Sequence, residues 1–166
     1  MTYDVEFTQL AMMTLYDLKG RSEDIAAWCG DAIPPFPTAP LSLTRHAQSE
    51  LLWLAPNHWI LRAPLEKENV LDEALKPNDA PANISIVRTS DSLVFFALHG
   101  VDLAEVMAVA SPLDIHPSKL AEGSAAFSEV FGIKALVLGN ASDIEIGVER
   151  SFGPMIADYL QRTIGN

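Results

Sequence analysis

The chain has 166 residues, about the length of one domain, and its single cysteine, Cys29, excludes an internal disulfide. Hydrophobic residues make up 49% of the sequence and charged residues only 20%, which is apolar for a free-standing domain and indicates that a partner covers part of the surface. The net charge of −11, with no stretch rich in Lys or Arg, argues against binding to nucleic acid or to an anionic membrane.

The first half of the chain is predicted to contain a strand, a helix, a hairpin and a second helix. These elements cover residues 10–18, 22–29, 51–55 with 59–61, and 65–75. Ser22 is expected to cap the first helix. Four prolines between Ile33 and Pro40 predict an irregular connector, which is either a lobe boundary or a strap that faces a partner. The hairpin carries one tryptophan on each arm, Trp53 and Trp59.

The second half is predicted to contain five strands and two helices. The strands cover residues 84–87, 93–98, 127–131, 133–138 and 144–149, and the helices cover residues 102–110 and 152–164. Asp102 and Ser151 are expected to cap these helices. The order predicts an α+β fold in which helices pack on one face of a mainly antiparallel sheet. We expect one compact domain over 1–166, with two related small lobes at about 1–80 and 81–166.

The segment Ser-Pro-Leu-Asp-Ile-His-Pro at residues 111–117 is predicted to be a short, stiff, strand-like loop. Pro112 and Pro117 each fix φ and favour extended geometry in the residue that precedes them. Because side chains alternate along an extended chain, Leu113 and Ile115 should face inward, and Asp114 and His116 should face outward.

The sequence contains no complete motif for a catalytic, cofactor-binding or metal-binding site. The four histidines, His46, His58, His99 and His116, are scattered and lack the spacing of metal ligands. The run Ser90-Asp91-Ser92 could be drawn beside His99 as a nucleophile set, but it is interpreted as a polar turn between two strands. Cys29 is interpreted as a small buried apolar group.

Three segments together resemble the gamma subunits of heterotetrameric sarcosine oxidase. They are the hairpin from Trp53 to Leu61, the segment from Pro112 to Pro117, and the run Glu149-Arg150-Ser151-Phe152, in the order and spacing of that family. The sequence differs from the family at Ala55, where glycine is usual, and at Asn57-His58, where an acidic pair is usual. These differences leave open whether the complex demethylates sarcosine or another N-methylated amine.

The resemblance implies the folate-binding fold of aminomethyltransferases and a non-catalytic gamma subunit within an oxidase that passes a methylene group to tetrahydrofolate. The implied partners are the large alpha subunit and the other subunits, which would hold FAD, FMN, NAD, tetrahydrofolate and zinc. The residues expected to contact partners are Trp53, Trp59, Asp114, His116 and Arg150.

The start of the chain does not resemble a secretory signal, and no apolar run is long enough to cross a bilayer, so a cytoplasmic location is expected. The alternatives to a gamma subunit are a stand-alone folate-binding protein of the aminomethyltransferase kind and a homo-oligomeric structural protein.

Overall fold

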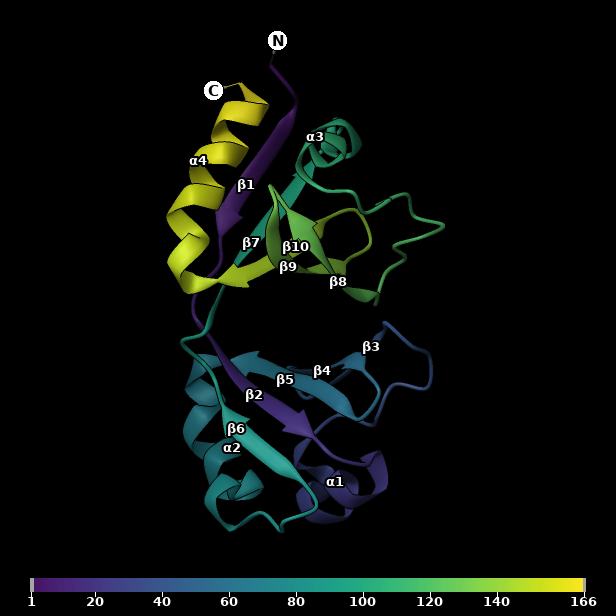
Figure 1. Ribbon diagram of the computed structural model, residues 1–166, viewed down its shortest axis with the longest axis vertical. Helices are drawn as coiled ribbons and strands as arrows, with labels where there is room; N and C mark the ends of the chain where they lie inside the picture. The colour runs from purple at the N-terminus through teal and green to yellow at the C-terminus, as the bar shows by residue number, and fades with distance from the viewer. Residues whose placement is uncertain (1, 166) are drawn as a thin grey trace. The chain divides into compact units, whose positions relative to one another are not determined.

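The computed structural model describes residues 2–165, which divide into two compact units (Figure 1). The central unit consists of residues 12–91, and the terminal unit combines residues 2–11 with residues 92–165. The division therefore falls at residues 91 and 92 instead of near residue 80. The reason is strand pairing, since the sixth strand joins the central sheet and the first strand joins the terminal sheet.

The central unit is a five-stranded antiparallel sheet with two helices. Its elements in chain order are β2 (Met13–Lys19), α1 (Ser22–Cys29), β3 (Leu43–His46), β4 (Ser49–Ala55), β5 (His58–Pro64), α2 (Glu68–Leu75) and β6 (Ser85–Arg88). The strand order across the sheet is β3-β4-β5-β2-β6. Three short 3-10 helices, η1 (Gly30–Ala32), η2 (Leu65–Lys67) and η3 (Pro77–Asp79), follow α1 or flank α2.

The terminal unit is also a five-stranded antiparallel sheet with two helices. Its elements are β1 (Val5–Gln9), β7 (Leu93–Gly100), α3 (Leu103–Ala110), β8 (Ala125–Val130), β9 (Ile133–Gly139), β10 (Ile144–Glu149), the 3-10 helix η4 (Arg150–Phe152) and α4 (Gly153–Ile164). The strand order is β1-β7-β10-β9-β8.

The two units have the same topology, which confirms the prediction of two related lobes in an α+β fold. The strand and helix order from β2 to α2 corresponds element by element to the order from β7 to α4. In the central sheet, β6 is the edge strand beside β2. In the terminal sheet the corresponding edge strand, beside β7, is β1, which comes first in the chain. The terminal sheet is therefore completed by the N-terminal strand.

Each sheet packs one face against its own pair of helices, as expected for an α+β fold. In the central unit, Tyr16 and Leu61 of the sheet form a core with Ile25 of α1 and Leu75 of α2. The Tyr16 hydroxyl also donates a hydrogen bond to Asp72 of α2 at 2.9 Å. In the terminal unit, alternate residues of β7, β9 and β10 form a second core with α3 and α4.

The hairpin of β4 and β5 and all four predicted helices are confirmed, but none of the three predicted cap side chains makes a capping hydrogen bond, and only Asp102 lies at the predicted N-cap position. Arg21, not Ser22, precedes α1, and its side chain makes no capping bond. Asp102 precedes α3 as predicted, but its carboxylate accepts a hydrogen bond from the backbone N–H of Asp4 at 2.8 Å instead of one from the helix. Ser151 lies in η4, where its hydroxyl donates to Glu149 at 3.0 Å.

Two strands were not predicted, β1 and β3, and the single strand predicted over residues 10–18 starts too early. Both missed strands are short, lie at sheet edges and carry several polar residues, so they give a weak hydrophobic pattern. The proline-rich connector lies inside the central unit, and its interpretation as a lobe boundary is therefore wrong.

Candidate functional site

The two tryptophans of the β4–β5 hairpin differ in burial. Trp59 is 4% exposed and belongs to the central core, where the Phe36 ring packs edge-on against it at 4.9 Å. Its indole N–H has no hydrogen-bond partner among residues 2–165. Trp53 is half-buried, and its indole N–H donates to the Ala55 carbonyl at 2.9 Å. Of the two, Trp53 is the one whose surface a partner could reach.

Phe36 comes from the proline-rich connector, so this contact ties the connector to the central core. Ile33 of the same segment is buried in that core. The Thr44 hydroxyl, at the start of the β3–β4 hairpin, donates to the Pro35 carbonyl. The connector is thus packed against the central unit, and its contact with a partner stays a prediction.

The segment from Pro112 to Pro117 has the alternating exposure that its sequence predicts. Leu113 and Ile115 are half-buried against the terminal core, whereas Asp114 and His116 are exposed. The Asp114 carboxylate accepts a hydrogen bond from the backbone N–H of His116 at 2.9 Å. Nδ1 of His116 lies 2.8 Å from the Ser118 hydroxyl and accepts the Ser118 backbone N–H at 3.2 Å. These bonds fix the loop between its two prolines.

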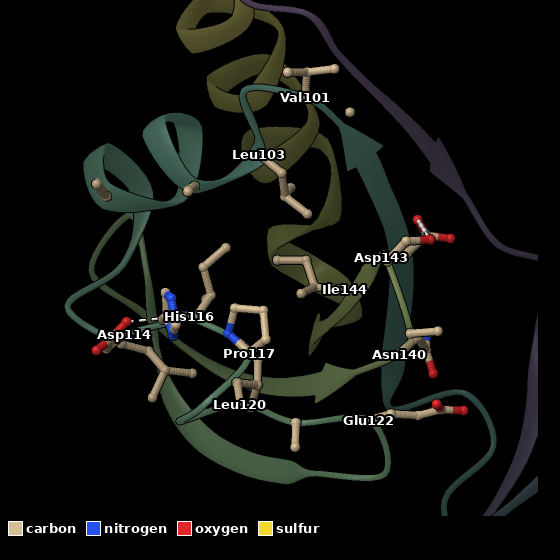
Figure 2. Close-up of a pocket in the computed structure, with 18 residues that line it drawn as sticks. Val101, Leu103, Asp114, His116, Pro117, Leu120, Glu122, Asn140, Asp143 and Ile144 are labelled. Carbon is tan, nitrogen blue, oxygen red and sulfur yellow. Dashed lines mark hydrogen bonds between the residues drawn. The ribbon is translucent and has the colours of Figure 1, made fainter.

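This loop forms one wall of a pocket of about 520 Å³ in the terminal unit, which we call the Asp114 pocket (Figure 2). The other walls come from α3 with the turn before it, from residues 120–122 ahead of β8, and from the β9–β10 loop. Its lining residues are Gly100, Val101, Leu103, Ala104, Ala108, Leu113–Pro117, Leu120–Glu122 and Asn140–Ile144. The only predicted site residues that line this pocket are Asp114 and His116.

Arg150, the remaining predicted site residue, lies at the start of η4 in the terminal unit. It is exposed, and its guanidinium donates to the Leu93 carbonyl at 3.4 Å. Its backbone N–H donates to the Ser92 carbonyl at 2.9 Å. Arg150 does not line the Asp114 pocket, and the two tryptophans belong to the central unit. The structure therefore brings together only Asp114 and His116.

A buried ion pair in the central sheet was not predicted from the sequence. The Arg62 side chain is 5% exposed and contacts the Glu50 carboxylate at 2.5 Å across the β4–β5 hairpin, and Arg45 of β3 reaches the same carboxylate at 2.9 Å. Burial alone would raise the pKa of Glu50, but the charge of Arg62, helped by Arg45, holds it below its ordinary value. The sequence signal was an arginine inside the apolar strand Trp-Ile-Leu-Arg-Ala.

The polar turn at Ser90 also has a structural role. The Ser90 hydroxyl contacts the Glu68 carboxylate of α2 at 2.5 Å and the Thr14 hydroxyl of β2 at 3.1 Å. The same hydroxyl accepts a hydrogen bond from the backbone N–H of Leu15 at 3.2 Å. The ionisable side chain that the Ser90 hydroxyl contacts is therefore that of Glu68 and not that of His99. Cys29 is buried, and burial raises the pKa of its thiol to about 11.

Within residues 2–165, no three His, Cys, Asp or Glu side chains are grouped as a metal ion would require. None of the helices in this range has the length and hydropathy of a membrane span.

Comparisons with known proteins place the chain among the gamma subunits. The family model described as "Sarcosine oxidase, gamma subunit family" matches residues 26–165. None of the curated protein sequences matches the chain significantly.

Three solved structures resemble the fold at low sequence identity. The heterotetrameric sarcosine oxidase from Corynebacterium sp. U-96, in complex with pyrrole 2-carboxylate, has a TM-score of 0.80 and 21% identity over 96% of this chain and 83% of that chain. Glycine cleavage system aminomethyltransferase T from Bartonella henselae has a TM-score of 0.69 and 15% identity. The match covers 96% of this chain but only 46% of the aminomethyltransferase.

The regulatory subunit of aspartate kinase from Thermus thermophilus, in its ligand free form, has a TM-score of 0.53 and 10% identity over 95% of this chain and 97% of that chain. At these identities the three structures establish the fold alone. The family model, in contrast, spans most of the sequence and includes all the segments on which the resemblance was based. This chain therefore belongs to the sarcosine oxidase gamma subunit family.

Proposed function

We propose that this chain is the non-catalytic gamma subunit of a cytoplasmic heterotetrameric sarcosine oxidase, whose other subunits demethylate sarcosine or a related N-methyl amine. The observation that carries the proposal is the match of the gamma subunit family model to residues 26–165. The partners would be the large alpha subunit and the remaining subunits. FAD, FMN, NAD, tetrahydrofolate and zinc would be held by those subunits.

The proposed role of the chain is to brace the large subunit through exposed residues on a rigid fold. Asp114, His116 and Arg150 are exposed, and Trp53 is half-exposed, so these side chains can reach a partner directly. Trp59 would act indirectly, because it is buried and supports the hairpin that carries Trp53. Hydrogen bonds hold Asp114 and His116 in place, which lowers the entropy lost on binding.

Co-expression tests this proposal. A tagged copy of the chain, produced together with the alpha and remaining subunits of its own organism, should yield a stable complex with one copy of each subunit, measured by mass photometry. Omission of this chain should reduce the yield of the assembled oxidase and its oxidation of sarcosine. A monodisperse monomer that never co-purifies with the other subunits would contradict the proposal.

A stand-alone folate-binding protein is the competing function, since the fold resembles an aminomethyltransferase. The match covers less than half of the aminomethyltransferase, so more than half of that enzyme has no counterpart in the sequence of this chain. Calorimetric titration of the isolated chain with tetrahydrofolate separates the two functions. We expect no heat of binding at micromolar concentration, whereas a dissociation constant near 1 μM, about −8.2 kcal/mol, would favour the competing function.

A further inference from the structure

We propose that the Asp114 pocket is a docking site for a segment of a partner subunit that carries an apolar side chain next to Lys or Arg. This inference rests on the proposed function, because it assigns one contact surface of the proposed subunit. The pocket lies wholly within the terminal unit.

The floor of the pocket is apolar. Leu103 of α3, Leu120 and Ile144 are 8%, 7% and 4% exposed, and Figure 2 shows Leu120 and Ile144 near the middle of the pocket beside Pro117. Val101, on the edge, is 83% exposed. Together with Leu113, Ile115 and Pro117, these residues form a continuous apolar lining, and contiguous apolar surface is typical of a protein contact site. The floor therefore suits an inserted apolar side chain.

The rim of the pocket is acidic. Asp114 lies on one side in Figure 2, and Glu122 and Asp143 lie on the other. Among residues 2–165, no Lys, Arg or His side chain forms an ion pair with any of these three carboxylates. No Lys or Arg lines the pocket, and its one basic side chain is His116. The rim is therefore complementary to a positively charged segment.

The wall formed by the Pro112–Pro117 loop is already fixed in an extended shape. Two prolines restrict the backbone, and Asp114 and Ser118 bond to His116. Because little ordering remains to be done on binding, such a wall suits an incoming chain. The segment that carries the family resemblance is thus the segment that shapes the pocket.

A partner segment fits better than a second copy or a small molecule. The chain carries a net charge of −11, so two copies repel each other, most strongly at an acidic rim. A small-molecule site usually buries 70–90% of its ligand. Here the edge residues Val101, Asp114, His116 and Pro117 are all exposed, which leaves room for a chain to pass across the opening.

The first test reverses charge at the rim. The rim variant combines Glu122→Lys with Asp143→Lys. Its control combines Glu105→Lys with Glu73→Lys, which gives the same net charge. The two control positions are exposed helical residues that do not line the pocket. The probe is the immobilised assembly of the remaining subunits, with affinity measured by biolayer interferometry. We expect the rim variant to bind about tenfold or more weakly than the control at about 50 mM salt, with a smaller difference at about 500 mM.

The second test fills the floor and does not depend on charge. Ala104 lies on the pocket side of α3 and is exposed, so Ala104→Phe should occupy the hollow without disturbing the core. Ala27→Phe, at an exposed position of α1, is the matched control. We expect Ala104→Phe to weaken binding by about tenfold and the control to leave it unchanged. Unchanged thermal midpoints establish that the variants are folded, and if the double lysine variant unfolds, Ala104→Phe decides alone.

The outcomes separate the two proposals. If the unmodified chain does not bind the remaining subunits at all, the proposed function and the docking site both fail. If it binds and the pocket variants bind as tightly as their controls, the docking site alone is refuted. A small cationic ligand in the pocket would produce that second outcome.

Discussion

The turn between β3 and β4 holds backbone strain that a double substitution should release. His46 pairs with Ser49, so Ala47 and Gln48 form a two-residue turn, and their φ angles are 49° and 67°. A two-residue turn with positive φ at both positions strongly prefers Asn-Gly. Both side chains are exposed, so replacing them removes no buried contact.

The size of the effect follows from these angles. The left-handed conformation costs a residue other than glycine about 1–2 kcal/mol. Ala47→Asn with Gln48→Gly relieves most of that cost at two positions, while the added glycine costs about 0.5–1 kcal/mol in chain entropy. We expect a net stabilisation of about 1–2 kcal/mol and a rise in Tm of about 2–6 °C for a chain of this length. The contact of Lys67 with the backbone carbonyl of residue 47 does not depend on the side chain that is replaced.

The assay is urea unfolding followed by far-ultraviolet circular dichroism, because this signal reports on both units, whereas Trp53 and Trp59 report on the central unit. The midpoint should rise at an unchanged slope. The control is Phe131→Asn in the β8–β9 turn, where φ is 51° but the ring packs edge-on against Tyr159 at 5.4 Å. The lost ring contact, about 0.5–1.5 kcal/mol, and lost burial should make this variant less stable. An unchanged midpoint in the double variant, or an equal gain in Phe131→Asn, would refute the reasoning.

Three further substitutions test other parts of the fold. In Gly100→Ala, the new Cβ would lie 2.1 Å from the Asp4 carbonyl oxygen, so β1 should detach, and limited proteolysis should then cleave the N-terminal segment that is protected in the unmodified chain. Arg62→Ala should lower the free energy of unfolding in urea by about 3 kcal/mol, because Arg45 is then the only arginine that contacts the largely buried Glu50 carboxylate. A loss below about 1 kcal/mol would show that the pair is solvated. The pKa of Glu50 is lower in the folded chain than in the unfolded chain, where it is about 4.3, so the ionised carboxylate stabilises the fold at pH values above about 4.3. This stabilisation is lost as the pH falls through the folded pKa. Glu50→Gln should therefore be less stable near pH 7 and lose less stability on acidification, and a pH profile parallel to that of the unmodified chain would contradict this.

The sequence by itself determined the elements that have strong periodic patterns. The helix over residues 153–164 and the hairpin around Pro56-Asn57 were predicted because apolar residues repeat at the helical period and turn residues separate two apolar runs. The sequence also determined the stiffness of the loop between Pro112 and Pro117, since proline restricts the backbone locally. Its resemblance to the gamma subunit family came from the same short segments, and it is confirmed by the family model.

Tertiary structure alone decided the features that depend on residues far apart in the chain. The pairing of β1 with β7 brings Asp4 to the start of α3, and no local pattern there could show that the Asp102 carboxylate would bond to Asp4 instead of to the helix. The buried pair of Arg62 and Glu50 likewise arises because a hairpin aligns their strands. The Asp114 pocket exists because α3, the proline-bounded loop and the β9–β10 loop converge, and convergence is a property of packing that one-dimensional spacing does not record.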